Sequence, residues 1–206
     1  MKEDILEQLA TDFLESQGYF VRANLRYRPS KSDADGLPEK FAYNTKQDSV
    51  HSDIDIVAYH PLKNGKDKVI VMSCRSYQDG FNINNEWKNL SKDRKPGGRD
   101  AWRYFRELCN PKWSRAYRRR IEEVTGEKEF IYYLTVTKIT PLKNKSIEEQ
   151  KKKWTEYKPF LDTLQAEIRI IELKEMVDEM MKTIGTKIES SELGRTLQLL
   201  KAAGVL

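Results

Sequence analysis

Apolar and polar residues alternate along the 206-residue chain with two different periods, which predict helices and strands in mixed order. From Ile5 to Leu14 the apolar residues recur at helical spacing and Gly18 follows them, so residues 2–17 are expected to form an amphipathic helix. The Asn64–Gly65 step favours an antiparallel hairpin between two of the predicted strands. Runs rich in β-branched and aromatic residues predict strands at 19–27, 52–60, 69–76, 130–139 and 167–173.

Helical spacing recurs between and after these strands. Residues 29–49 contain two prolines, a glycine and no sustained period, which predicts an irregular insertion. The element order predicts the α/β (α+β) class, with a mixed central sheet flanked by helices. A core domain is expected over 1–173, and 174–206 is expected to form a helical extension that packs on the core or stands apart. The further predicted helices are 84–90, 100–110 with Asp100 as N-cap, 112–126, 146–165 with a break near Pro159, 174–183, and 191–203 with Ser190 or Ser191 as cap.

Composition narrows the class of protein. A third of the residues are charged and the net charge is +5, which favours a polyanionic partner once the positive charge is located. The chain has no apolar run of membrane-spanning length, and its acidic first residues differ from a signal peptide, so a cytoplasmic protein without membrane contact is expected. Two cysteines and two histidines are too few for a disulfide framework or a structural zinc site, so both cysteines are expected to be reduced.

The predicted hairpin carries the first candidate site. Strand alternation is expected to place His51, Asp53, Asp55 and Val57 on the face opposite to Ile54, Ile56 and Ala58. On the return strand, the same alternation places Val69, Val71, Ser73 and Arg75 on one face and Ile70, Met72 and Cys74 on the other. Asp55, Ser73 and Arg75 are therefore expected to converge. A carboxylate among apolar neighbours needs a compensating cation or hydrogen bonds, so Asp55 is interpreted either as a site residue or as an ion-paired strand end.

The segments SDIDIVAYHPL and KVIVMSCRSYQ resemble the core hairpin of the PD-(D/E)XK nuclease superfamily, closest to its Mrr-like and archaeal resolvase-like branches. The resemblance covers roughly residues 1–90 well, and the two later strands fit by order only. It implies a restriction endonuclease-like αβββαβ core that hydrolyses phosphodiesters with Mg²⁺. It also implies that Asp55 is the strand aspartate, Glu7 the supporting acid of the first helix, and Ser73 and Arg75 the counterparts of the family's acid-x-Lys motif.

The last two positions depart from the family pattern. A serine hydroxyl is a poorer magnesium ligand than a carboxylate, and arginine is too basic to accept a proton. Asp55 alone predicts weak metal binding and little hydrolysis. Glu86 and Lys88, on the next predicted helix, are candidates for a migrated second metal ligand and a migrated cation. Residues two apart do not share a helix face, so Glu86 is favoured, with a solvated helix acid as the alternative.

A basic helical segment spans 88–126. From Lys88 to Arg120 it has twelve Lys or Arg residues against the acids Asp93, Asp100 and Glu107, with aromatic residues interleaved. Clustered cations neutralise phosphates and aromatic rings stack on unpaired bases, which favours a nucleic-acid contact. The alternative is a pair of amphipathic helices with solvated arginines. The candidate contact residues are Lys92, Arg94, Lys95, Arg99, Arg103, Arg106, Lys112, Arg115, Arg118 and Arg119.

Three functions remain open. The first-ranked hypothesis is a nucleic-acid-binding protein on a PD-(D/E)XK nuclease scaffold, with DNA favoured over RNA. Within it, a weakened or migrated site with Asp55 and Glu86 as Mg²⁺ ligands would make the protein a metal-dependent DNA endonuclease. The alternative is a non-catalytic protein-interaction module that retains the nuclease-like fold. Homodimerisation is left open.

Overall fold

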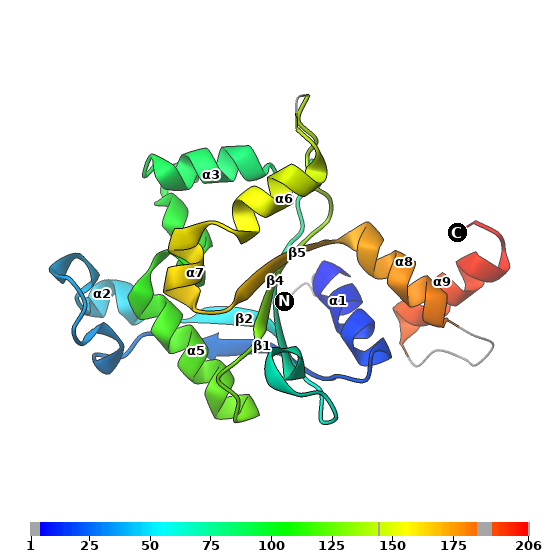
Figure 1. The fold of residues 1–206 in the computed structure, drawn as a ribbon, viewed down its shortest axis with the longest axis horizontal. Helices are drawn as coiled ribbons and strands as arrows, with labels where there is room; N and C mark the ends of the chain where they lie inside the picture. Colours follow the sequence, from blue (N-terminus) through cyan, green and yellow to red (C-terminus); the bar gives the residue numbers. More distant parts are fainter. Residues whose placement is uncertain (1–4, 144, 185–190, 206) are drawn as a thin grey trace.

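The computed structural model describes residues 5–143, 145–184 and 191–205, and over these residues the chain forms one mixed sheet with helices on both faces (Figure 1). The strands lie in their sequence order, with the first three antiparallel and the last two parallel to the third. The predicted class, a mixed sheet flanked by helices, is confirmed. The strands are β1 (Phe20–Tyr27), β2 (Ser52–Tyr59), β3 (Val69–Arg75), β4 (Ile131–Val136) and β5 (Glu167–Glu172).

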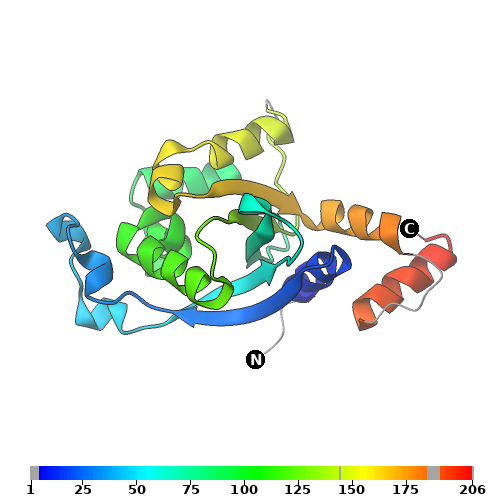
Figure 2. The same ribbon diagram turned by 60° about the horizontal axis from the view of Figure 1, so that its bottom comes forward.

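Each face of the sheet has its own apolar cluster. The larger cluster, which includes Trp113, Tyr132 and Trp154, lies under α3 (Ile83–Ser91), α4 (Arg106–Cys109), α5 (Pro111–Thr125), α6 (Ile147–Thr155) and α7 (Lys158–Leu164). The smaller cluster lies under α1 (Ile5–Ser16), α8 (Leu173–Thr183) and α9 (Glu192–Ala202). Figures 1 and 2 show α8 and α9 at one end of the molecule and the segment before β2 at the other. The C-terminal helices pack on the core through Met176, Met180 and Leu197.

Local capping explains where α5 and α6 begin and end. The Asn110 side chain accepts hydrogen bonds from the first free backbone N–H groups of α5, Pro111 occupies its first turn, and Gly126 ends it in the left-handed region. Ser146 and Glu149 form a capping box at the start of α6. Gly126 was the expected end of this helix, so its boundaries are set by local sequence.

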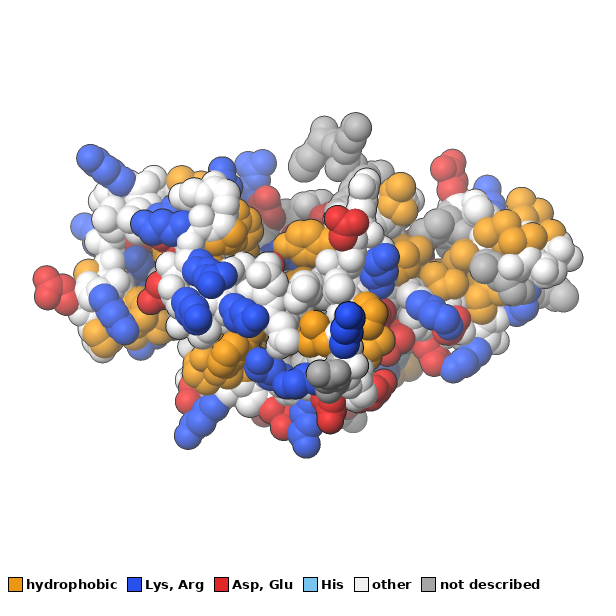
Figure 3. Space-filling view, turned by 90° about the horizontal axis from the view of Figure 1, so that it is seen from above, with side chains coloured by type: hydrophobic (Ala, Val, Ile, Leu, Met, Phe, Trp, Pro, Cys, Tyr) orange, Lys and Arg blue, Asp and Glu red, His pale blue; other side chains and the backbone are white. Residues whose placement is uncertain are grey.

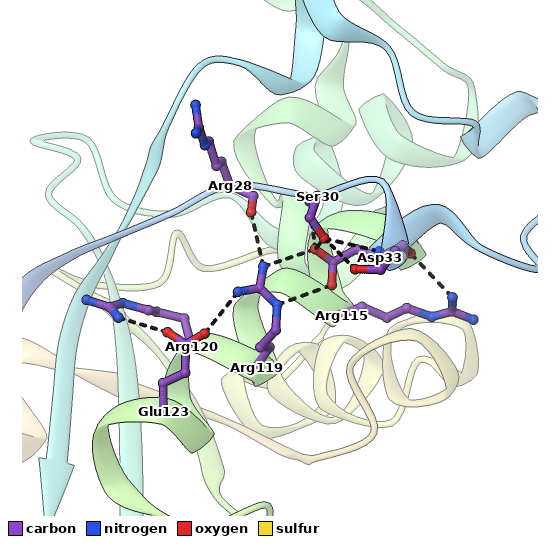
Figure 4. A network of polar contacts seen from close by, with 8 residues as sticks. Arg28, Ser30, Asp33, Arg115, Arg119, Arg120 and Glu123 are labelled. Carbon is purple, nitrogen blue, oxygen red and sulfur yellow. Dashed lines mark hydrogen bonds and ion pairs between the residues drawn. The ribbon is translucent and has the colours of Figure 1, made fainter.

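The insertion at 29–49 contains short helical turns rather than a structureless loop: η1 (Ser32–Ala34), η2 (Glu39–Phe41) and α2 (Thr45–Asp48). Cations of α5 hold it. Arg119 forms an ion pair with Asp33 at 3.0 Å, and Arg115 donates a hydrogen bond to the Asp35 carbonyl oxygen at 2.7 Å (Figure 4). Because these partners lie about 80 positions apart in the sequence, periodicity alone does not reveal their contact.

The structure corrects two local expectations. The predicted helix 100–110 is divided at Phe105 into the 3-10 turn η5 (Ala101–Tyr104) and α4, because Phe105 buries its ring with non-helical backbone angles, and Asp100, its expected N-cap, makes no side-chain capping hydrogen bond. Asn64 and Gly65 do not form a two-residue hairpin turn, because η3 (Gly65–Lys68) lengthens the connection. Ser191 caps α9, whereas Ser190 and residues 2–4 of the first predicted helix lie outside the described residues.

Candidate nucleic-acid interface

Strands β2 and β3 part before β3 ends, at a point that we call the fork. Their ladder runs from Tyr59–Val69 to Ile56–Met72. One position further along β2, the Asp55 carboxylate accepts the Cys74 backbone N–H at 2.7 Å. A side chain thus takes the place of a carbonyl oxygen in the ladder. Ile54 then packs with the larger apolar cluster, not with Ile56 on the opposite face, so the expected strict alternation of β2 is interrupted here.

Arg75 extends from the end of β3 and closes the fork. Its guanidinium lies 3.7 Å from Asp55 and donates hydrogen bonds to the carbonyl oxygens of Cys74 and Tyr104, at 3.0 and 2.9 Å. The side chains of Arg75 and Asp55 are 27% and 17% exposed, so solvent reaches both. The arginine is held in place by both strand and helical turn, yet remains open to a ligand.

A polar pocket of about 190 Å³ opens at the fork; we call it the fork pocket. It brings together Asp55, Ser73 and Arg75, as the hairpin pattern predicted. The rest of its lining comes from β2, η5, α4 and α5: Ser52, Asp53, Ile54, Arg103, Tyr104, Arg106, Glu107 and Tyr117. Three guanidinium groups and three carboxylates therefore share a small volume.

Glu107 is the site residue that sequence reasoning missed. It is buried on α4, and its carboxylate accepts the Tyr132 hydroxyl at 2.7 Å. In the sequence it is one acid in a basic segment, and no motif marks it. Nothing in the sequence indicates its burial, which depends on where α4 packs.

Charge and burial compete at the fork. Burial raises the pKa of Asp55, and neither Arg75 nor the Cys74 N–H cancels this effect. Glu107 and Asp53 raise the pKa further. Burial opposes the charge of Arg75, but Asp55 and then Glu107 outweigh it and raise the pKa of that guanidinium. The carboxylates of the fork pocket thus stabilise the charged form of Arg75, whereas burial destabilises the charged form of Asp55.

Arg106 is the least compensated cation of the fork pocket. Burial lowers the pKa of its guanidinium, and the like charges of Arg103 and Arg99 add to this effect. The guanidinium lies 4.4 Å from the centre of the Trp113 ring, and its Nη1 atom is buried without a hydrogen-bond partner among the described residues. A buried donor without a partner is costly, so this guanidinium is held at a free-energy cost.

The side chains present do not fit a magnesium site. No group of three His, Cys, Asp or Glu that could hold a metal is found among the described residues. Asp55 faces a guanidinium, and Glu107 already accepts the Tyr132 hydroxyl. Magnesium prefers several free oxygen ligands in near-octahedral geometry. Asp53, the third carboxylate of the fork pocket, is exposed and lies 4.0 Å from Arg26, so the pocket does not present several free oxygen ligands together.

The other predicted catalytic residues lie elsewhere. Glu7 is on α1, which covers the opposite face of the sheet from the fork pocket. Glu86 is on α3, where burial raises the pKa of its carboxyl and its charge acts on Tyr77. Lys88 is exposed on the same helix. None of the three lines the fork pocket, which takes its second buried carboxylate from α4.

The ten predicted contact residues divide into two groups. Five contact other groups of the protein. Lys112 is buried in an ion pair with Asp48, Arg115 and Arg119 hold the insertion, Arg118 donates to Gln165, and Arg106 lies over Trp113.

The other five are Lys92, Arg94, Lys95, Arg99 and Arg103, between α3 and α4. Lys95 and Arg103 form ion pairs with Asp100. Lys92, Arg94 and Arg99 are exposed, and their side chains make no hydrogen bond or ion pair within the described part of the chain.

A further cationic cluster joins α3 to α6. The Lys153 ammonium lies 4.0 Å from the centre of the Trp87 ring and donates to Asn84 at 3.3 Å. Burial lowers the pKa of Lys153, and the charges of Lys145 and Lys88 lower it further. Figure 3, which looks onto this side of the molecule, shows Lys and Arg side chains gathered over α3 and its neighbours. The basic surface therefore extends beyond 88–126.

Comparison of the chain with protein-family models, curated proteins and solved structures found no significant match. Among the described helices, none has both the length and the apolar character needed to cross a bilayer.

Proposed function

We propose that this protein binds nucleic acid through the fork pocket and the basic surface beside it. The observation that carries the proposal is the convergence of Arg75, Arg103 and Arg106 at the fork. Planar guanidinium groups in a fixed arrangement suit phosphate oxygens. The exposed cations between α3 and α4 would contact neighbouring phosphates, which supply most of the affinity in such interfaces.

Together with nucleic-acid binding, we propose that the core has a restriction endonuclease-like fold. Support comes from the order of one helix, three antiparallel strands, helices and a parallel strand, and from an aspartate on β2 facing a Ser-x-Arg motif on β3. The resemblance is to enzymes that cut DNA, so DNA is the partner proposed in preference to RNA. A nuclease-like scaffold that has lost its metal ligands would keep a surface shaped for the DNA backbone.

Hydrolysis is not part of this proposal, because Arg75 stands beside Asp55 and Ser73 replaces an acid. The fork pocket is therefore expected to bind a phosphate rather than attack it. If Mg²⁺ or Mn²⁺ supports cleavage of plasmid or branched DNA by the wild type, and Asp55→Ala abolishes that cleavage, the binding-only proposal is wrong.

The binding proposal is tested by fluorescence anisotropy with labelled single- and double-stranded oligonucleotides at several salt concentrations. The logarithm of the affinity should fall linearly with the logarithm of the salt concentration, by roughly 0.7 to 0.9 per phosphate contacted. Arg94→Gln and Arg99→Gln should each weaken binding for all sequences alike and reduce that slope by about 1 for a full phosphate contact. Both residues are exposed and make no side-chain ion pair among the described residues, so the fold should be kept.

Lys174→Gln is the control on the opposite face of the sheet, because Lys174 is an exposed cation of α8, where it pairs with Asp178. It should leave the affinity unchanged. Equal losses in the control and the arginine variants would mean a diffuse charge effect and no defined interface. Absence of salt-dependent binding to any oligonucleotide would remove the proposal, and a stable protein complex in its place would favour the interaction module.

A further inference from the structure

A second and larger cavity lies beside the fork pocket, between the insertion and the helices α3, α4 and α7. Its volume is about 670 Å³, within the range of pockets that enclose small ligands. Part of its lining comes from α4, which separates the two sites: Arg106 and Glu107 line the fork pocket, and Leu108 and Cys109 line this cavity. A strand held at the fork would therefore pass close to the larger cavity.

Aromatic side chains line this cavity, which we call the aromatic cavity. Trp102 and Tyr157 are half-buried and pack against the larger apolar cluster, and Phe41 and Tyr43 contribute from the insertion. The Arg103 guanidinium lies 5.4 Å from the centre of the Trp102 ring and also lines the fork pocket. An aromatic ring of this cavity and an arginine of the fork pocket thus occupy adjacent positions in the chain.

The wall formed by the insertion is fixed in place. Lys112, buried below it, forms an ion pair with Asp48 at 2.6 Å and donates to the Ala42 carbonyl oxygen at 2.9 Å. Asp48 in turn accepts the Asn44 backbone N–H at 2.7 Å. Because this wall is hydrogen-bonded before any ligand arrives, binding a flat ring there would cost little ordering of the chain.

The aromatic cavity also offers directional polar groups. The side-chain oxygen of Asn110 accepts backbone N–H groups of α5, which leaves its NH₂ group as a donor in a cavity that Asn110 lines. Glu39 and Asp93 supply acceptors in the same lining. A planar ligand with both acceptors and exocyclic amino groups matches this set, and nucleobases have both.

We propose that the aromatic cavity receives one unpaired base of a bound nucleic-acid strand, stacked on Trp102, while Arg103 and its neighbours hold the adjacent phosphates. This inference rests on the proposed function and adds its substrate class: single-stranded or locally unpaired nucleic acid. Aromatic stacking contributes about 1–3 kcal/mol per base, which corresponds to roughly 5- to 150-fold in affinity.

The test compares two labelled single-stranded oligonucleotides of equal length and charge, one intact and one with abasic sites throughout. Wild-type protein should bind the intact strand roughly 5- to 150-fold more tightly, with the same salt dependence for both. In Trp102→Leu the ratio should fall toward one while the salt dependence stays unchanged. Circular dichroism and the thermal midpoint establish that the variant is folded.

Asn110→Asp is a second variant that is independent of Trp102. Aspartate is as good an N-cap as asparagine, so α5 keeps its capping acceptor while the cavity loses the NH₂ donor. The preference for the intact strand should decrease, and Arg94→Gln should weaken binding to both strands equally. Equal affinity of wild type for intact and abasic strands overturns the aromatic-cavity inference and leaves the proposed function standing. Absence of binding to either strand overturns both.

Discussion

At the scale of single residues, the fork shows how a charged side chain is kept inside a sheet. Asp55 is mostly buried, and it is retained by a backbone N–H of the neighbouring strand and by the Arg75 guanidinium. These interactions do not fully replace water, since burial still raises the pKa of the carboxyl. Asp55 is thus a residue that costs stability where it stands, which is typical of functional positions.

This cost predicts the pH dependence of Asp55→Asn. The folded protein holds the Asp55 proton more tightly than the unfolded chain, so the contribution of Asp55 to the free energy of unfolding falls as pH rises from the ordinary value of 3.8 through the raised one. Asparagine keeps an acceptor for the Cys74 N–H but has no charge to lose. The variant should therefore gain stability relative to wild type as pH rises from about 4 to about 7 in urea unfolding. If the stability of wild type instead rises relative to Asp55→Asn over that pH range, the raised pKa of Asp55 is wrong.

At the scale of elements, the insertion is the part of the chain whose structure depends most on distant partners. Its turns are fastened by three cations of α5, one of them in a buried pair with Asp48. Several basic residues of 112–119 thus hold the insertion against α5. These include arginines that the sequence alone had suggested as nucleic-acid contacts.

Lys112→Met should be strongly destabilising. It leaves the Asp48 carboxylate buried without its cation, a situation that costs about 3–5 kcal/mol. Adding Asp48→Asn should recover most of that loss, because the charge disappears while an acceptor for Asn44 remains. Denaturant unfolding of the single and double variants measures this coupling, and proteolysis within 29–49 should quicken in the single variant. Asp178→Ala, which removes an exposed ion pair with Lys174 on α8, serves as the comparison and should cost under about 1 kcal/mol.

Helices and strands could be predicted from the sequence where nearby residues determine their bounds. All five strands, the end of α5 at Gly126 and the Ser191 cap of α9 follow from local pattern. The division of 100–110 at Phe105 did not follow, because it depends on a ring that buries against Trp154 of α6. The convergence of Asp55 with Arg75 was predictable from strand alternation, whereas Glu107 enters through a long-range packing of α4 that no spacing encodes.

At the scale of the whole molecule, the two faces of the sheet have different roles. The fork pocket, the aromatic cavity and the basic surface all lie with α3–α7, and α1, α8 and α9 close the other face. Changes on the second face are therefore expected to alter stability without altering affinity.

Two leucines of α9 provide a matched test of this division. Leu197 is buried against the smaller cluster, and Leu199 is 71% exposed. Leu197→Ala should destabilise the protein by about 2–5 kcal/mol, and Leu199→Ala should change its stability by less than about 0.5 kcal/mol. Neither should change oligonucleotide affinity when measured well below the thermal midpoint. A selective loss of binding in either folded variant would show that the C-terminal helices belong to the interface.

The parting of β2 and β3 beyond Ile56 and Met72 also bears on how such a protein can evolve. Beyond that pair, β3 remains hydrogen-bonded to β4, so Ser73 and Arg75 can be substituted without loss of the sheet. The side chains that β3 contributes to the fork pocket can therefore change over time while the sheet that carries them persists.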